Sequence, residues 1–161
     1  MRIGKIAMLG MALIVGLVVT ATGAGSAGSA SILQADTLAG VSGPYVGATN
    51  PIRDVNGGGI PWDIAKGKVE LEADGSLEVE VEGLVLATTG ANPVPSFRAI
   101  VSCQTIVDGA AAVRNVSTDP FLATTTGDSK IEATVSLPDP CFAPIVFVTS
   151  PTGSWFAVTG A

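Results

Sequence analysis

The sequence predicts an all-β protein: a single antiparallel β-sandwich of about seven to nine strands with one disulfide, immunoglobulin-like or of a similar Greek-key type. Three observations lead to this prediction. Apolar and polar residues alternate in several short segments. Runs of turn-forming residues separate these segments. Downstream of residue 30, no apolar pattern of helical period extends over ten residues.

The first part of the chain, residues 1–30, has the composition of a signal peptide. Arg2 and Lys5 give a short positive segment, and fourteen uncharged, mostly apolar residues follow at positions 6–19. A membrane-spanning helix needs about 20 apolar residues, so this run is short for an uncleaved anchor. We therefore expect a leader that is cleaved during export.

The cleavage position is open, because small residues permit a cut after Ala24, Ala27 or Ala30. The expected mature chain, residues 31–161, has the size of one domain. Removal of the leader leaves six of the eight basic residues against fourteen acidic ones, which changes the formal net charge from −6 to −8. This balance disfavours nucleic acid as a partner.

The least strand-like stretch, residues 43–67, is the candidate binding loop. It combines three consecutive glycines with the only tyrosine of the chain and several charged and amide side chains, a mix that suits ligand binding from a rigid scaffold. The candidate contact residues are Tyr45, Arg53, Asp54, Asn56, Trp62 and Asp63. A structural interpretation competes with this one and is favoured: a long crossover needs glycine and proline to turn, and Tyr45 and Trp62 would close the end of the core.

Residues 66–86 predict a β-hairpin with one wet face, since apolar residues occupy odd positions and charged residues even ones. A two-residue turn at Asp74 and Gly75 would pair Leu71 with Glu78 and mix apolar and acidic side chains on one face. A three-residue loop, residues 73–75, pairs Leu71 with Leu77 instead and keeps the faces separate.

The predicted register also arranges the charges. Glu70 lies opposite Glu78, whereas Lys68 faces Glu80 and Lys66 faces Glu82, so the charges partly cancel across the strands. Calcium sites prefer oxygens that converge from a loop. We therefore expect a solvated face, with a cation site as the less favoured alternative.

Six further β-rich segments follow, at residues 97–103, 111–116, 121–126, 130–137, 144–149 and 155–160. The segment 130–137 alternates and predicts one wet face. Positions 145–148 have no polar residue, which predicts a strand covered on both faces or near the middle of a sheet. Turn formers at 150–154 then predict a C-terminal hairpin.

Two cysteines, Cys103 and Cys141, lie in the exported part of the chain. An oxidising compartment favours a disulfide between them. On the chain-entropy model, closing a loop of this length stabilises the fold by about 4 kcal/mol. A reactive thiol pair is disfavoured, because the close CxxC spacing is missing.

The absence of histidine excludes several kinds of active site. It removes Ser-His-Asp and Cys-His catalysis, histidine-ligated zinc and blue copper. The stretch that begins at Asp54 resembles the start of an EF-hand loop, but its twelfth position is Ala65 instead of an acid. The sequence predicts neither a metal site nor a cofactor.

The expected mature chain resembles a group of small exported bacterial all-β proteins. Three segments show the resemblance: VSGPYVGATNPIRDVNGGGIPW, FRAIVSC and CFAPIVFVTSPTGSWFAVTG. It extends over nearly the whole exported part. The resemblance implies export and an all-β domain, and it implies no activity or site residues.

The expected function is that of a secreted, extracellular, non-catalytic module that binds a protein or carbohydrate or has a structural role. After leader cleavage no membrane contact is expected. The alternative is a carboxylate-dependent hydrolase that acts on polysaccharide, with a pair such as Asp54 and Asp63 as its acid and base. Such an enzyme would need the two carboxyl groups about 5 to 10 Å apart.

Overall fold

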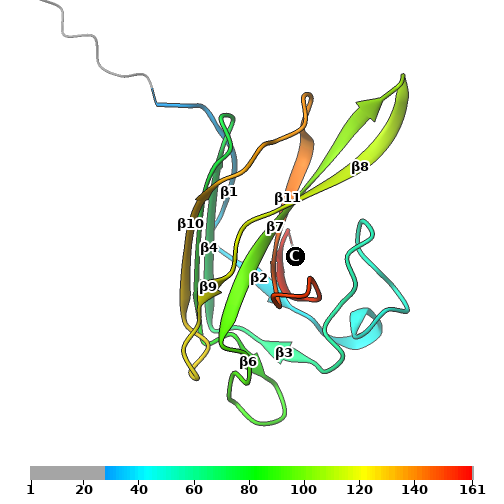
Figure 1. The fold of residues 1–161 in the computed structure, drawn as a ribbon. Coiled ribbons are helices and arrows are strands. Elements are labelled where there is room, and N and C mark those ends of the chain that lie inside the picture. Colours follow the sequence, from blue (N-terminus) through cyan, green and yellow to red (C-terminus); the bar gives the residue numbers. More distant parts are fainter. Residues whose placement is uncertain (1–27, 161) are drawn as a thin grey trace, which may run out of the picture.

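Two antiparallel sheets pack face to face in the computed structural model, which describes residues 28–160 (Figure 1). The predicted signal peptide therefore falls almost wholly outside the described residues. Within residues 28–160, no helix is long and apolar enough to cross a membrane. The predicted all-β sandwich with one disulfide is confirmed.

The first sheet has four strands in the order β1-β4-β5-β10. These strands are β1 (Ser31–Ala35), β4 (Lys66–Glu72), β5 (Ser76–Glu82) and β10 (Ser129–Thr134). Their inward side chains alternate with charged or polar ones along each strand. One face is consequently buried and the other is wet.

The second sheet has the order β2-β12-β11-β7-β8, with β9 paired to the start of β7. Its strands are β2 (Leu38–Gly40), β12 (Trp155–Thr159), β11 (Phe142–Thr149), β7 (Ser96–Val107), β8 (Ala110–Ser117) and β9 (Phe121–Leu122). A two-stranded ribbon pairs β3 (Trp62–Asp63) with β6 (Val85–Leu86), and a 3-10 turn spans Gly43–Tyr45.

The register predicted for the β4–β5 hairpin is confirmed. Leu71 lies opposite Leu77, and the loop between the strands has three residues. Gly75 closes this loop with φ of +90°, and a side chain there would collide with the carbonyl oxygen of Val135. Only glycine satisfies both requirements, so this residue fixes which face of the hairpin becomes apolar.

Aromatic side chains fill the space between the two sheets. Trp62 stacks on Phe156 with ring centroids 3.9 Å apart, and Phe97 meets both rings edge-on. The rest of this inner core consists of aliphatic side chains, among them Val69, Leu71, Leu77, Val79, Ile131, Val101, Val146 and Val148.

The structure has twelve strands within residues 28–160, more than the seven to nine predicted, and several strand boundaries differ from the sequence prediction. Nine of the twelve strands in residues 28–160 have three or more residues, but the segment 121–126 contributes only the two-residue β9. The chain turns back after it because the backbone N–H of Asp128 donates to the Thr124 hydroxyl. Strand β10 ends at Thr134, three residues early, and Val135 donates its N–H to Gly75 instead.

The predicted disulfide joins Cys103, buried in β7, to Cys141, which directly precedes β11. Strand β11 lies between β12 and β7, and four consecutive residues at its end are buried. The prediction of a strand covered on both faces is thereby confirmed. The second sheet must have a cover on the face that points away from the first.

Substitution of Leu71 by Asp should unfold the domain or lower its free energy of unfolding by about 4 kcal/mol or more, because Leu71 is fully buried in the hairpin. Glu72→Asp is the matched control, since it places the same carboxylate on the wet face one residue away. Urea titration of both variants measures the contrast. Equal losses would show that the hairpin faces are assigned incorrectly.

Candidate functional site

The candidate site lies on the outer face of the second sheet. Strand pairing places Ile100, Ser102 and Phe147 on the face opposite to Phe97 and Val101. Trp155 belongs to the same outer face, since its ring centroid lies 6.0 Å from that of Phe147. These residues are buried although they point away from the first sheet. The cover segment, which we define as residues 43–61, lies over them (Figure 1).

The cover segment is attached to the sheet along the edge of β12. Trp155 donates its backbone N–H to Asn56 and accepts from the N–H of Gly58. Gly47 exchanges hydrogen bonds with both glycines, donating to Gly58 and accepting from Gly57. Residues 56–58 therefore behave as an additional short piece of strand, paired in parallel with the start of β12.

The glycine run in this segment serves close packing. A side chain at Gly57 would collide with the carbonyl oxygen of Tyr45. At Gly58 it would touch the rings of Phe156 and Trp62 at 3.1 to 3.3 Å. These two glycines let backbone approach backbone and aromatic rings directly.

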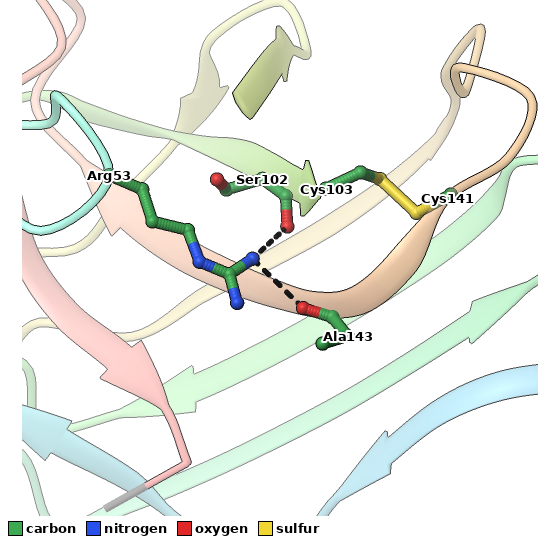
Figure 2. The surroundings of a disulfide bond; sticks show 5 residues. All are labelled: Arg53, Ser102, Cys103, Cys141 and Ala143. Atoms are coloured by element: carbon green, nitrogen blue, oxygen red, sulfur yellow. Dashed lines mark hydrogen bonds between the residues drawn. A yellow bond between two sulfur atoms is a disulfide. The ribbon is translucent and has the colours of Figure 1, made fainter. Parts of the chain in front are cut away.

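Arg53 fastens the far end of the cover segment to the sheet (Figure 2). Its Nη1 donates to the carbonyl oxygens of Ser102 and Ala143, at 2.9 and 2.8 Å. The ladder between β7 and β11 is irregular here, and Pro144 in the irregular stretch has no N–H to donate. One guanidinium thus supplies donors at a bulge beside the disulfide (Figure 2).

The turn that presents Arg53 has an uncommon backbone. Arg53 and Asp54 have φ of +48° and +67°, and Ile52 and Val55 exchange both backbone hydrogen bonds around them. Positive φ at both central residues matches a type I′ turn, in which glycine and asparagine are preferred. This conformation costs about 1 kcal/mol or more for each non-glycine residue. The Arg53 contacts, together with a bond from the Asn115 amide to the Arg53 carbonyl, offset that cost.

Tyr45 is the exposed aromatic of the cover segment. The residue is 45% exposed, and its ring centroid lies 6.5 Å from that of buried Trp155. Ile60, also in the segment, is 46% exposed. Asp54 and Asn56 are exposed as well. The outer surface of the segment therefore offers an aromatic, an aliphatic and two polar side chains.

Trp62 and Asp63 lie elsewhere. Trp62 is only 4% exposed, and its stacking on Phe156 agrees with the structural interpretation of this residue. Asp63 is exposed in β3, opposite Val85 of β6. The structure thus places Tyr45, Arg53, Asp54 and Asn56 on the cover segment, and it separates them from the other two candidates. Asp54 and Asp63 belong to different elements.

Sequence reasoning missed the groups that hold the segment in place. These are the carbonyl oxygens of Ser102 and Ala143, the Asn115 amide, and Trp155 beneath Tyr45. A partial signal existed, because the apolar run at 155–158 has no wet face and requires a cover on both sides.

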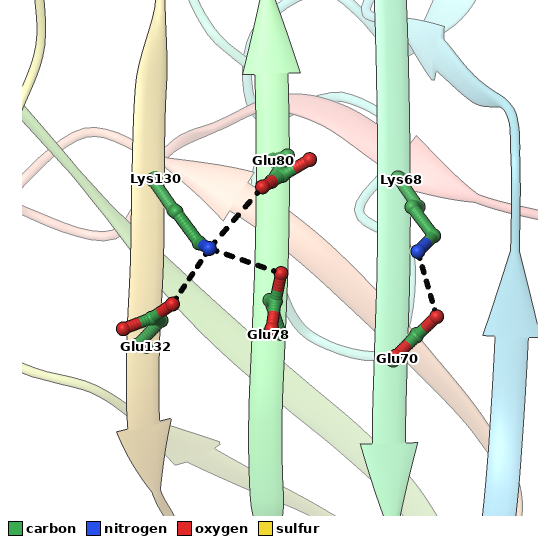
Figure 3. A network of polar contacts seen from close by, with 6 residues as sticks. All are labelled: Lys68, Glu70, Glu78, Glu80, Lys130 and Glu132. Carbon is green, nitrogen blue, oxygen red and sulfur yellow. Dashed lines mark ion pairs between the residues drawn. The ribbon is translucent and has the colours of Figure 1, made fainter.

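The second candidate surface is the wet face of the four-stranded sheet. All six glutamates of the chain and the lysines at 66, 68 and 130 lie on it. Lys130 contacts Glu132 at 2.7 Å, Glu78 at 3.2 Å and Glu80 at 3.3 Å (Figure 3). Lys68 pairs with Glu70 at 2.7 Å. The repulsion expected between Glu70 and Glu78 is therefore relieved by a lysine on either side.

The electrostatics of this face are those of exposed ion pairs. Hydrogen bonds that Lys130 donates to Glu132, Glu78 and Glu80 raise the pKa of Lys130, and the bond that Lys66 donates to Glu82 raises the pKa of Lys66. Both lysines therefore stay protonated at neutral pH. Among residues 28–160, no three acidic, cysteine or histidine side chains are arranged to hold a metal ion. Lys68 and Lys130 are placed to neutralise these carboxylates.

Comparison of the chain with protein-family models, with curated proteins and with solved structures finds no match. We therefore infer the function from the geometry of the two surfaces.

Trp62→Ala should lower the free energy of unfolding by about 3 to 5 kcal/mol, because it empties the centre of the aromatic cluster. The matched control is Tyr45→Ala, which should cost about 1 kcal/mol or less, since the tyrosine ring is half exposed. Chemical unfolding followed by circular dichroism measures both. A loss for Tyr45→Ala as large as that for Trp62→Ala would contradict the assigned positions.

Proposed function

We propose that the protein is a secreted, non-catalytic β-sandwich module that binds an extracellular protein or carbohydrate through the cover segment. One observation supports this proposal most: an exposed aromatic, Tyr45, stands on an irregular segment that is fixed to a rigid sheet. Binding residues are commonly found on loops that a scaffold holds in place. A fixed loop loses little conformational entropy when a ligand binds.

The composition of the segment fits contact with a sugar ring or a peptide. An aromatic such as Tyr45 supplies a large contact area at a low entropic cost, and it stacks on apolar faces. Asp54 and Asn56 offer hydrogen-bonding groups on the same segment. The strongly charged surface of the molecule lies on the other sheet, away from this contact area.

Two points favour binding over catalysis. The chain has no histidine, which removes the commonest acid-base groups. The carboxylates considered for a hydrolase, Asp54 and Asp63, lie on separate elements: Asp54 in the turn of the cover segment and Asp63 in β3.

The formal net charge of the chain, −6, disfavours nucleic acid as the ligand.

Export is the second part of the proposal. The disulfide between Cys103 and Cys141 suits an oxidising compartment, and the leader pattern suits secretion. We propose a cut after Ala24 or Ala27, because residues 29 and 30 contact the β4–β5 loop. Ala30 accepts a hydrogen bond from the N–H of Ala73, and the Ser29 hydroxyl accepts one from Asp74. A cut after Ala24 or Ala27 keeps both contacts, whereas a cut after Ala30 removes them.

N-terminal sequencing of the secreted protein should therefore find Gly25 or Gly28 as the first residue. Retention of Met1 in released material would contradict export by cleavage. A protein that begins at Ser31 would show that the contacts of residues 29 and 30 are dispensable.

A binding screen tests the proposed function. The protein should be offered to cell-wall and plant polysaccharides and to extracellular proteins, with and without Ca²⁺. We expect it to retain one class of ligand and Tyr45→Ala to weaken that binding at least about tenfold, an effect typical of a central contact residue. Leu122→Ala is the control, because Leu122 is 87% exposed on β9, outside the cover segment.

Three results would count against the proposal: no ligand retained from the panel, equal weakening by both variants, or full binding by Tyr45→Ala. Release of reducing sugar ends from a polysaccharide would instead support the hydrolase.

A further inference from the structure

The free edge of the second sheet differs from the other sheet edges of the molecule. Strand β8 is eight residues long and forms the end of the sheet beside β7, and it extends with β7 beyond the rest of the sandwich (Figure 1). Proteins usually protect such an edge with charges, proline, a bulge or a very short strand. The sequence of β8, AAAVRNVS, has none of these devices except one arginine.

The other edges are protected. Strand β10 exposes Lys130 and Glu132, β1 has an irregular register, and β2 is only three residues long. Among the described residues, β8 has no comparable charge pair, irregular register or short length. In the described part of the chain, the backbone hydrogen bonds of β8 go to β7. The outward N–H and C=O groups are therefore available for another strand.

An apolar surface accompanies this edge. Phe142, Gln104 and Val113 stand in one row across β11, β7 and β8, and Ile106 and Ala111 form the next row on the same face. Ile106 and Phe142 are each 54% exposed. The cover segment stops one row earlier, where Arg53 accepts from Asn115. A shallow hollow lined by Gln104, Ala111, Ala112 and Val113 marks the uncovered end.

We propose that β8 pairs in antiparallel fashion with β8 of a second copy of this chain, about a two-fold axis at Val113. In this register Val113 faces Val113 of the second copy, and each Arg114 faces an Ala112, so no like charges meet. A two-fold interface requires such self-complementarity. The two second sheets would then continue through the interface.

The same register explains why a second copy of this chain fits the β8 edge. Asn115 of one copy lies opposite Ala111 of the other. The covered end of each strand, where the turn at Arg53 sits on Asn115, therefore lies beside the uncovered Ile106–Ala111 row of the second copy. Each cover segment would shield the apolar row of the second copy. The glutamates lie on the other sheet and do not enter the contact.

Sedimentation equilibrium of the purified protein at about 100 µM tests the proposal, a concentration at which even a modest interface associates. The wild type should have twice the monomer mass. Val113→Lys and Val113→Glu should each be monomeric, because like charges then face each other across the axis. An equimolar mixture of the two variants should recover the dimer mass. Thr134→Lys, on the exposed edge strand β10, is the matched control and should leave the dimer intact.

A second measurement does not depend on how well the charged variants fold. Val113→Cys should form an intermolecular disulfide on air oxidation, and Thr134→Cys should not. A monomeric wild type, a dimer that Val113→Lys leaves unchanged, or a Val113→Cys protein that fails to cross-link would each overturn the proposal.

Discussion

The second sheet of this protein is buried on both faces around strands β11 and β12, and this constraint determines most of the remaining structure. Strands β11 and β12 contain apolar runs that would expose hydrophobic side chains on either face, so both faces of the sheet have to be covered from water. The four-stranded sheet covers one face, and the cover segment covers the other. The need to exclude water explains the sequence of that segment, which has glycines where backbones meet and an arginine where the β7–β11 ladder is irregular.

Charge is distributed to match this arrangement. Every glutamate of the chain and the three lysines of residues 28–160 lie on the wet face of the first sheet, where they form exposed pairs. Exposed pairs contribute little to stability. Their more important effect is to keep that face and the β10 edge hydrated, so that sheets do not associate there. The opposite side of the molecule has the exposed Tyr45 and the uncharged part of β8, and both of our functional proposals concern that side.

Much of the fold was predictable from local patterns. The period-two alternation of residues 68–82 leaves only one loop length that keeps Leu71 and Glu78 on different faces, and the position of Gly75 agrees with it. The unbroken apolar run around Phe147 likewise predicted a doubly covered strand, and two cysteines in an exported chain predicted one bridge.

The candidate site was less predictable, for a physical reason. An irregular segment has no periodicity, so the sequence does not tell which aromatic points inward, and burial of Trp62 with exposure of Tyr45 depends on contacts distant in sequence. The role of Arg53 depends on a bulge at residues 143 and 144. Ala143, which accepts one of its hydrogen bonds, is 90 residues away from Arg53 along the chain.

We infer that the cover segment is part of the folded sheet structure rather than a mobile loop. Amide hydrogen exchange measured residue by residue tests it most directly, because the N–H groups of Gly57 and Gly58 donate to Gly47 and Trp155. We expect these two amides to be protected to within about tenfold of the amides of β11, since they would open only with the sheet. Exchange of both amides at the rate of an unstructured peptide, while β11 stays protected, would contradict it.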